Sequence, residues 1–373
     1  MSQPADGGGA GSPPAGRLID LELGHPGHTP PDSARAAIVQ ALMESRPLPY
    51  APGPGLTRLR GALAQRVTAA SGLACDAEWV VVTAGASAAL AAAILAGSAE
   101  GAEVLCPDPG YAPFAQLTRR LARVPVHYPA SVGRGNDLAA LEAAITPRSS
   151  ALIWNSPSNP AGDVATPEAA RLVAELARDR GLTLISDEVY CDLAYDRPHV
   201  SPGRWAGERY FGVYSFSKSH GMAGWRVGWL VAPPELAAEA SKAHWALSMS
   251  VSTLGQAAAM GALAAPDSYL EGVRDALRAR RDAVHDQLTA AGMPAARPQG
   301  GFFFWLDVRG TGRSGAAFCD GCREEAGVAL TPGHVFGPAS EGFARLSFGG
   351  PENQVLEGAR RVAACYGRWA APD

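Results

Sequence analysis

A lysine, two serines and an arginine lie close together in one glycine-rich stretch of this sequence. The stretch SFSKSHGMAGWRVGW covers residues 215–229 and contains Ser215, Ser217, Lys218 and Arg226. None of its residues is a carboxylate, so the two cations lack an ion-pair partner nearby in the sequence. Burial disfavours a charged lysine that has no counter-charge. A bound anion, or a covalent bond to the lysine amine, would remove this penalty.

Other residues capable of chemistry follow predicted strands. Each of these strands is a short apolar run, such as 78–85, 151–155 or 182–186. Ligands of open α/β sheets bind beyond the carboxyl ends of the strands, so we expect these residues to share one site. Backbone amides at the helix start after the first strand favour a phosphate, and Arg226 adds a bidentate donor. The residues in these positions are Gly85, Ala86, Ser87, Asn159, Asp187, Tyr190, Ser215, Ser217 and Lys218.

The elements that carry these residues alternate between strands and helices. The helix after the 151–155 strand is clearly signalled, with Thr166 as its N-cap, Pro167 in its first position and Gly181 after its end. Further strands are predicted within 209–216 and 227–232. Near-continuous apolar strands that alternate with helices indicate an α/β fold, with a mainly parallel sheet sandwiched by helices.

The pattern of elements divides the chain into four parts. Residues 1–16 are rich in glycine, proline and alanine and are predicted to form a disordered tail. The large α/β domain is predicted at 48–255, and a smaller α+β domain with longer helices at 256–373. The segment 17–47 is expected to pack with the small domain. Probable strand sequences of that domain are GGFFFWLDV, residues 300–308, and ARLSF, residues 344–348.

Composition excludes several classes of protein. The chain has 373 residues, of which 47% are hydrophobic and 18% charged, and its formal net charge is -4. This balance argues against binding to nucleic acid or to an anionic membrane, and no apolar run is long enough to span a bilayer. A cytoplasmic location is predicted. Cys319 and Cys322 form a CxxC, but without a second pair or a histidine cluster we expect no metal site.

Several motifs together resemble a known family. The spacing S-x-S-K-x(5)-G-x-R-x-G around Lys218 resembles the cofactor-lysine signature of class I and II aminotransferases. These are pyridoxal-phosphate enzymes of the aspartate aminotransferase fold, fold type I. NPAG at 159–162 and SDEVY at 186–190 lie at the distances typical of that family. PGY at 109–111 and YAPGPGLTRLRGAL at 50–63 match as well, so the resemblance covers most of the chain.

The resemblance implies roles for the residues around the cofactor ring. Lys218 would form a Schiff base with pyridoxal 5'-phosphate and then move the substrate proton. Asp187 would pair with the pyridine nitrogen and keep the ring electron-withdrawing. Tyr190 and Asn159 would hydrogen-bond the ring oxygen, and Tyr111 would stack on the ring.

The resemblance also assigns residues to the phosphate, the substrate and a second subunit. Gly85, Ala86, Ser87, Ser215, Ser217 and Arg226 would surround the cofactor phosphate. Tyr50 resembles the tyrosine that reaches the phosphate from the partner subunit, which implies a homodimer with shared active sites. Arg345 resembles the arginine that holds the substrate carboxylate, and Gly24 the glycine of a mobile segment that closes over substrate.

The predicted activity is transfer of an amino group between an α-amino acid and a 2-oxo acid. The shared motifs leave open a lyase, a decarboxylase or a cyclase on the same scaffold, because the pocket chooses the bond that breaks. A non-catalytic effector-binding domain is a further alternative, although only a short polar tail precedes the fold here.

Two positions depart from the family pattern. Ala161 stands where threonine is usual, and Gly27 stands where an acid is usual, in the segment that closes over substrate. Family members that prefer aspartate supply a second cation, which binds the side-chain carboxylate of that substrate. The two positions that can carry it correspond here to Ser87 and to His244 or Trp245, and none of these residues is a lysine or an arginine. A buried second carboxylate without a partner is strongly disfavoured. We therefore expect a donor other than aspartate, with His244 or Trp245 lining its side-chain pocket.

Overall fold

The computed structural model describes residues 18–44, 48–130 and 138–370, so the predicted tail at 1–16 lies outside it. A seven-stranded sheet forms the centre of the described chain, in the order β2-β8-β7-β6-β5-β3-β4. Its strands are β2 (Val80–Thr83), β3 (Glu103–Asp108), β4 (Val124–Pro129), β5 (Ser149–Asn155), β6 (Thr183–Asp187), β7 (Tyr210–Ser215) and β8 (Gly228–Val231). Only β8 runs antiparallel to its neighbours among these strands, which confirms the predicted mainly parallel sheet.

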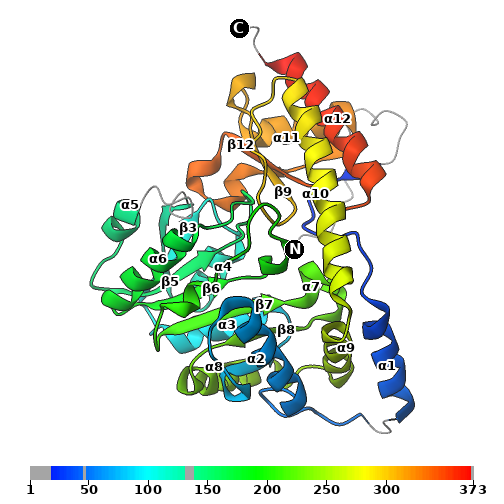
Figure 1. Ribbon diagram of the computed structural model, residues 1–373. Coiled ribbons are helices and arrows are strands. Elements are labelled where there is room, and N and C mark those ends of the chain that lie inside the picture. Colours follow the sequence, from blue (N-terminus) through cyan, green and yellow to red (C-terminus); the bar gives the residue numbers. More distant parts are fainter. Residues whose placement is uncertain (1–17, 45–47, 131–137, 371–373) are drawn as a thin grey trace, which may run out of the picture.

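Helices cover both faces of this sheet (Figure 1). One face packs on α3 (Ala86–Gly97), α4 (Pro113–Arg120) and α8 (Pro234–Ser248). The other packs on α2 (Thr57–Ser71), α6 (Pro167–Asp179) and α9 (Thr253–Leu263), and α5 (Leu138–Ala143) lies beside α6. Val81 points to the first face while Val80 and Val82 point to the second, as the alternation of a strand requires. Burial on both faces explains why the strands are apolar throughout.

The helix α6 begins and ends as its sequence predicts. The hydroxyl of Thr166 accepts a hydrogen bond of 3.0 Å from the backbone N–H of Ala169, and Pro167 is the first helical residue. Gly181 has φ of +68°, a left-handed conformation that ends helices at low steric cost. The helix therefore returns the chain to β6, whose last residue is Asp187.

A smaller group of elements lies above the sheet in Figure 1. It contains the antiparallel sheet β11-β12-β9, formed by Thr331–Pro332, Phe343–Ser347 and Phe303–Asp307. It also contains α10 (Asp267–Ala290), α11 (Gly315–Ala326) and α12 (Glu352–Trp369). A buried cluster that includes Phe302, Phe304, Leu346 and Val362 joins these elements into one core. The long helix α10 runs along the side of the molecule from one group to the other (Figure 1).

The N-terminal segment contacts both groups of elements. Strand β1 (Ile19–Asp20) pairs in parallel with β10 (Val328–Ala329) of the smaller group. Helix α1 (Asp32–Glu44) instead packs on α9, and its Ala34 belongs to the buried cluster under the large sheet. We therefore keep the two-domain division as a proposal and place its boundary after α9, since α9 belongs to that same cluster. No helix of the described residues is long and apolar enough to cross a membrane.

Candidate active site

A cavity of about 350 Å³ lies at the carboxyl ends of β5, β6 and β7, below the small antiparallel sheet. It brings together side chains and backbone from both groups of elements and from the N-terminal segment. Its position follows the rule for open α/β sheets. The predicted site residues that line it are Gly24, Ala86, Ser87, Tyr111, Asn159, Asp187, Tyr190, Ser215, Ser217, Lys218, Arg226 and Arg345.

Lys218 enters the cavity from α7 (Phe216–Ser219), a single helical turn that directly follows β7. Its Nζ donates a hydrogen bond of 2.7 Å to the carbonyl oxygen of Gly24 and has no ion pair among the described residues. Burial, together with the nearby positive charge of Arg345, lowers the pKa of Lys218 to about 8, although the negative charge of Asp187 opposes this shift. The lysine therefore carries more neutral, nucleophilic amine near pH 7 than an exposed lysine does.

Two adjacent carboxylates at the end of β6 differ in their surroundings. Asp187 accepts a hydrogen bond of 3.2 Å from the backbone N–H of Val189, and burial raises its pKa to about 7. Glu188 points away from this cavity and accepts hydrogen bonds from the hydroxyls of Ser201 and Tyr210. Although burial raises the pKa of Glu188, these bonds and His199 lower it below its usual value. Asp187 is thus the poorly paired carboxylate, ready to accept a cationic N–H in the cavity.

The start of α3 forms an anion cradle. Gly85 is its N-cap with φ of +84° and no side-chain cap, so the first backbone N–H groups of the helix keep no side-chain partner. A Cβ at Gly85 would meet Nη2 of Arg226 at 2.4 Å, so only glycine lets this guanidinium approach. Arg226 donates to two backbone carbonyls and pairs with no carboxylate of the described chain. Ser215 and Ser217, joined by a hydrogen bond of 2.8 Å, add hydroxyls to the same end of the cavity.

Arg345 closes the opposite end of the cavity from β12. Its Nη1 donates a hydrogen bond of 3.0 Å to Oδ1 of Asn159, and Nη2 donates to the backbone oxygen of Glu22. The guanidinium lies 4.3 Å from the ring centre of Phe303, and burial lowers its pKa to about 10. Nε of Arg345 is buried without a partner in the described chain. A bound carboxylate would supply the missing counter-charge.

Comparison with known proteins decides the family. The family model described as aminotransferase class I and II matches residues 17–362. The chain belongs to this family. It is 38% identical over 355 residues to the arginine–pyruvate transaminase of Pseudomonas aeruginosa, covering 93% of this chain and 90% of that protein. The fold and the lysine signature therefore agree with an aminotransferase.

Solved structures of aminotransferases share the fold over nearly the whole chain. Aspartate aminotransferase from Thermus thermophilus with maleate superposes with a TM-score of 0.88 at 33% identity, covering 94% of this chain and 92% of that one. The aromatic aminotransferase from Pyrococcus horikoshii gives a TM-score of 0.89 at 31% identity, covering 93% and 95%. The names of these similar proteins differ in the amino acid, so the family alone does not fix the donor. This chain is an aminotransferase that transfers an amino group between an amino acid and a 2-oxo acid.

Aminotransferases of this family depend on pyridoxal phosphate, and the residues of the cavity fit that group. The cradle of Gly85, Ala86 and Arg226 suits a phosphate, and the poorly paired Asp187 suits a protonated ring nitrogen. Tyr111 and Tyr190 place aromatic rings in the cavity, and burial raises the pKa of both phenols. Both therefore remain hydrogen-bond donors at neutral pH.

Several lining residues of this aminotransferase were not predicted. Asn155 ends β5. Its side-chain N–H donates to the backbone oxygen of Asp187 at 3.0 Å, and its side-chain oxygen accepts from the backbone N–H of Asn159 at 2.8 Å. The strand-end rule could have identified it, because it directly precedes the loop that carries Asn159. The others offer no such signal, since they are apolar or lie far away in the sequence. They are Glu22, Leu23, Leu90, Val189, Ala223 and Phe303.

Four predicted residues lie outside the cavity: Gly85, Tyr50, His244 and Trp245. Gly85 lies next to the lining residue Ala86, and its lack of a side chain leaves room for the guanidinium of Arg226. Tyr50 is 82% exposed and does not line the cavity within one chain. The prediction for His244 is wrong: this side chain is fully buried, and its Nε2 accepts a hydrogen bond of 3.2 Å from the backbone N–H of Ala84. Its role is to support the turn before α3.

Trp245 and the CxxC cysteines also lie away from the cavity. Trp245 is 55% exposed at the end of α8, so the idea that it lines a side-chain pocket stays a prediction for an assembly with a second subunit. Cys319 and Cys322 are buried free thiols on α11. Within the described residues no group of histidine, cysteine or acidic side chains is arranged to hold a metal ion.

Proposed function

We propose that this aminotransferase uses pyridoxal phosphate held by Lys218 and takes its amino group from a donor with a non-acidic side chain. The observation that carries this proposal is the number of cations in the cavity. Among the described lining residues these are Lys218, Arg226 and Arg345. Each of the three already has a partner in the proposed chemistry: the cofactor aldehyde, the cofactor phosphate and the substrate α-carboxylate. No cation of one chain remains for a second carboxylate.

The residues of the chain divide the proposed reaction between them. When bound, the cofactor supplies an electron-withdrawing ring that stabilises negative charge at the substrate α-carbon. Asp187 would keep the ring nitrogen protonated, and Tyr190 and Asn159 would hydrogen-bond the ring oxygen. Arg345 orients the substrate through its carboxylate. Lys218 would act as the base that removes the α-proton of the substrate.

The apolar part of the cavity lining supports a neutral or apolar donor. Leu23, Leu90, Val189 and Phe303 line the cavity, and the apolar side chain of Phe303 is fully buried. Moving a carboxylate into such surroundings without a partner costs several kcal/mol. An aliphatic or aromatic side chain instead gains free energy when it leaves water. This contrast sets the expected order of donors.

A basic donor is a second candidate. Glu22 lines the cavity, and its carboxylate is shared with Arg323 of α11 at 2.8 Å. A cationic substrate side chain could compete for this exposed pair, and such pairs are weak in water. The similarity to an arginine–pyruvate transaminase supports the same candidate.

A panel of amino donors with pyruvate as common acceptor tests both candidates. We expect leucine, phenylalanine or arginine to give the highest kcat/KM and aspartate a value lower by roughly 100-fold, since an unpaired buried charge costs several kcal/mol. Glu22→Gln should lower kcat/KM for arginine while leaving leucine unchanged if the basic donor is the natural one. Aspartate as the best donor would refute the proposal about the side chain and leave the amino transfer itself intact.

We further propose that the working unit is a homodimer with shared active sites. The large apolar side chains that stay exposed are concentrated in α1, in the segment around Tyr50 and at the end of α8. They include Val39, Met43, Leu48, Tyr50, Trp245 and Leu247. A patch of this kind on a monomer marks an interaction surface. Trp245 lies beside the same segment, since a Cβ at Gly53 would be 3.4 Å from its ring.

A further inference from the structure

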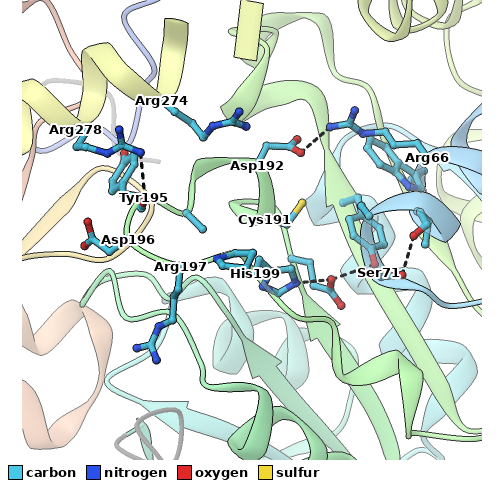
Figure 2. A pocket seen from close by; sticks show the side chains of 17 residues that line it. Arg66, Ser71, Cys191, Asp192, Tyr195, Asp196, Arg197, His199, Arg274 and Arg278 are labelled. Atoms are coloured by element: carbon cyan, nitrogen blue, oxygen red, sulfur yellow. Dashed lines mark hydrogen bonds and ion pairs between the residues drawn. The ribbon is translucent and has the colours of Figure 1, made fainter. Parts of the chain in front are cut away.

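A second cavity of about 470 Å³ lies on the other side of the segment that follows β6 (Figure 2). Its walls come from α2, from residues 191–199 and from α10. It shares no lining residue with the candidate active site. Its volume falls in the range of ordinary small-molecule sites. The amino transfer described above makes no use of it.

Arginine side chains dominate the polar lining of this cavity. Arg66 pairs with Asp192 at 2.6 Å, and Arg278 pairs with Asp275 of its own helix at 3.0 Å. Arg197 donates to the side-chain oxygen of Gln299 at 2.6 Å. These three guanidinium groups therefore have partners within the protein.

Arg274 differs from the other three arginines. It is half-buried and makes no hydrogen bond or ion pair with any described residue. In Figure 2 its guanidinium points into the cavity toward Asp192, which is already bonded to Arg66. Arg274 stands one helical turn before Arg278, so both lie on the same face of α10. A half-buried guanidinium that points into a cavity and has no protein partner can bind an oxyanion there through charge-assisted hydrogen bonds.

Two further polar atoms at this cavity lack partners. The side chain of His199 is only 8% exposed, and its Nε2 lies 2.8 Å from Oε2 of Glu188. Because Glu188 is held in its ionised form, Nε2 must donate, which leaves Nδ1 facing no partner of the described chain. Nε of Arg197 is also buried and unpaired. Buried polar atoms without partners are uncommon, and a ligand or ordered water usually completes them.

We propose that this second cavity binds a small organic monocarboxylate, with Arg274 as its principal cation. A guanidinium binds a carboxylate or a phosphate through two parallel hydrogen bonds. The balance of charge favours the carboxylate, because four arginines face three acids in the lining: Glu188, Asp192 and Asp196. A doubly charged phosphate would meet repulsion from these acids. Val67, Ala70 and Trp229 also line the cavity and suit a hydrocarbon chain.

An occupant of this cavity would lie close to the reactive lysine. Asp187 and Tyr190 line the first cavity, whereas Glu188 and Asp192 line the second, so one short segment separates the two sites. Ser219, the residue next to Lys218, is hydrogen-bonded at 2.8 Å to His220, whose ring interacts electrostatically with Asp192. A carboxylate that competes with Asp192 for Arg66 would therefore act close to the helix turn α7 that carries Lys218.

Titration calorimetry of the cofactor-loaded protein with isovalerate tests the proposal. This branched monocarboxylate has no amino group to transfer, but it can also occupy Arg345 in the first cavity. We expect two sites per chain in the wild type and one in Arg345→Gln. In the Arg345→Gln background, Arg274→Gln should weaken the remaining site by roughly tenfold or more, since it removes a charged hydrogen-bonding partner. Inorganic phosphate should bind that site more weakly than isovalerate.

Two other variants serve as controls for the place of binding and for the loss of a positive charge. Ala70→Phe, made in the Arg345→Gln background, fills the cavity from an exposed helix position. It should abolish the remaining site although no arginine of this second cavity is replaced. Lys242→Gln removes one exposed positive charge elsewhere and should leave both sites intact. Isovalerate binding that is absent from Arg345→Gln alone overturns the proposed site. Binding that stays unchanged when Arg274→Gln or Ala70→Phe is added to Arg345→Gln overturns it as well. Tighter binding of phosphate than of isovalerate there overturns the assignment to a carboxylate.

Discussion

The Nζ of Lys218 donates its hydrogen bond to the backbone oxygen of Gly24, a residue 194 positions earlier in the chain. Gly24 lies just after β1, which pairs with β10 in the smaller group of elements. A Cβ at Gly24 would meet the ring of Phe303 at 2.8 Å and lie 3.9 Å from Nζ of Lys218. The absence of a side chain therefore lets the N-terminal segment cross directly over the lysine.

The sequence contains two lysines, Lys218 and Lys242, which allows a direct test of the first. Lys218→Ala should lower turnover by several orders of magnitude, because no other amine lines the cavity among the described residues. Borohydride reduction of the wild type followed by peptide mapping should find the cofactor on Lys218. Lys242 is exposed and paired with Glu239, so Lys242→Ala should keep wild-type turnover. Near-normal turnover in Lys218→Ala would contradict the proposed role.

Asp187→Asn should lower kcat by roughly 100-fold, because the ring nitrogen loses the negative partner that keeps it protonated. Stopped-flow measurement of α-proton removal with deuterated donor checks that this step has become slow. Glu188→Gln is the matched control, since Glu188 is buried but faces away from the cavity. It should lower the free energy of unfolding through its hydroxyl partners and leave kcat within tenfold of wild type. An Asp187→Asn enzyme with unchanged kcat would show that this carboxylate does not tune the ring.

Tyr50 should act only across a subunit interface, because within one chain it is 82% exposed. Tyr50→Phe should weaken cofactor binding while leaving the dimer intact. Replacing Met43, which is 76% exposed on α1, by aspartate should instead favour the monomer and lower activity with it. Sedimentation at assay concentration measures both effects. A fully active monomer would disprove the shared active site.

His220 should make the protein less stable in acid. Burial lowers the pKa of His220 from 6.5 to about 4, so the folded state binds its proton later than the unfolded chain does. The stability that depends on a neutral ring is complete above pH 6.5 and is lost as pH falls toward 4. The expected loss at pH 4 is about 3 kcal/mol.

Chemical unfolding of wild type and His220→Gln across this pH range measures the effect. The difference in the free energy of unfolding between the two proteins should shrink as the pH falls. The exposed His25 offers a control, and His25→Gln should track the wild type at every pH. A His220→Gln curve parallel to wild type would mean that the buried ring takes up its proton normally.

The sequence by itself determined the chemistry of the catalytic segment and the class of the fold. The spacing of Ser215, Ser217, Lys218 and Arg226 is local, because Ser215 ends β7, Ser217 and Lys218 lie on α7, and Arg226 follows eight residues after the lysine. The same is true of Thr166 and Pro167, whose capping roles depend only on neighbouring backbone groups. Apolar runs likewise predicted the parallel sheet, since burial on both faces requires them. Signals of this kind need no knowledge of distant parts of the chain.

Only the tertiary structure decided what surrounds these residues. Glu22 and Phe303 enter the cavity through strand pairing and packing between segments far apart in sequence. His244 was expected at the pocket by its position, yet the direction of one helix face buries it against the turn at Ala84. The second cavity, with Arg66 and Arg274 on different helices, has no local signature at all. Side-chain direction and the meeting of distant elements depend on the packed core, and a linear pattern does not encode these locally.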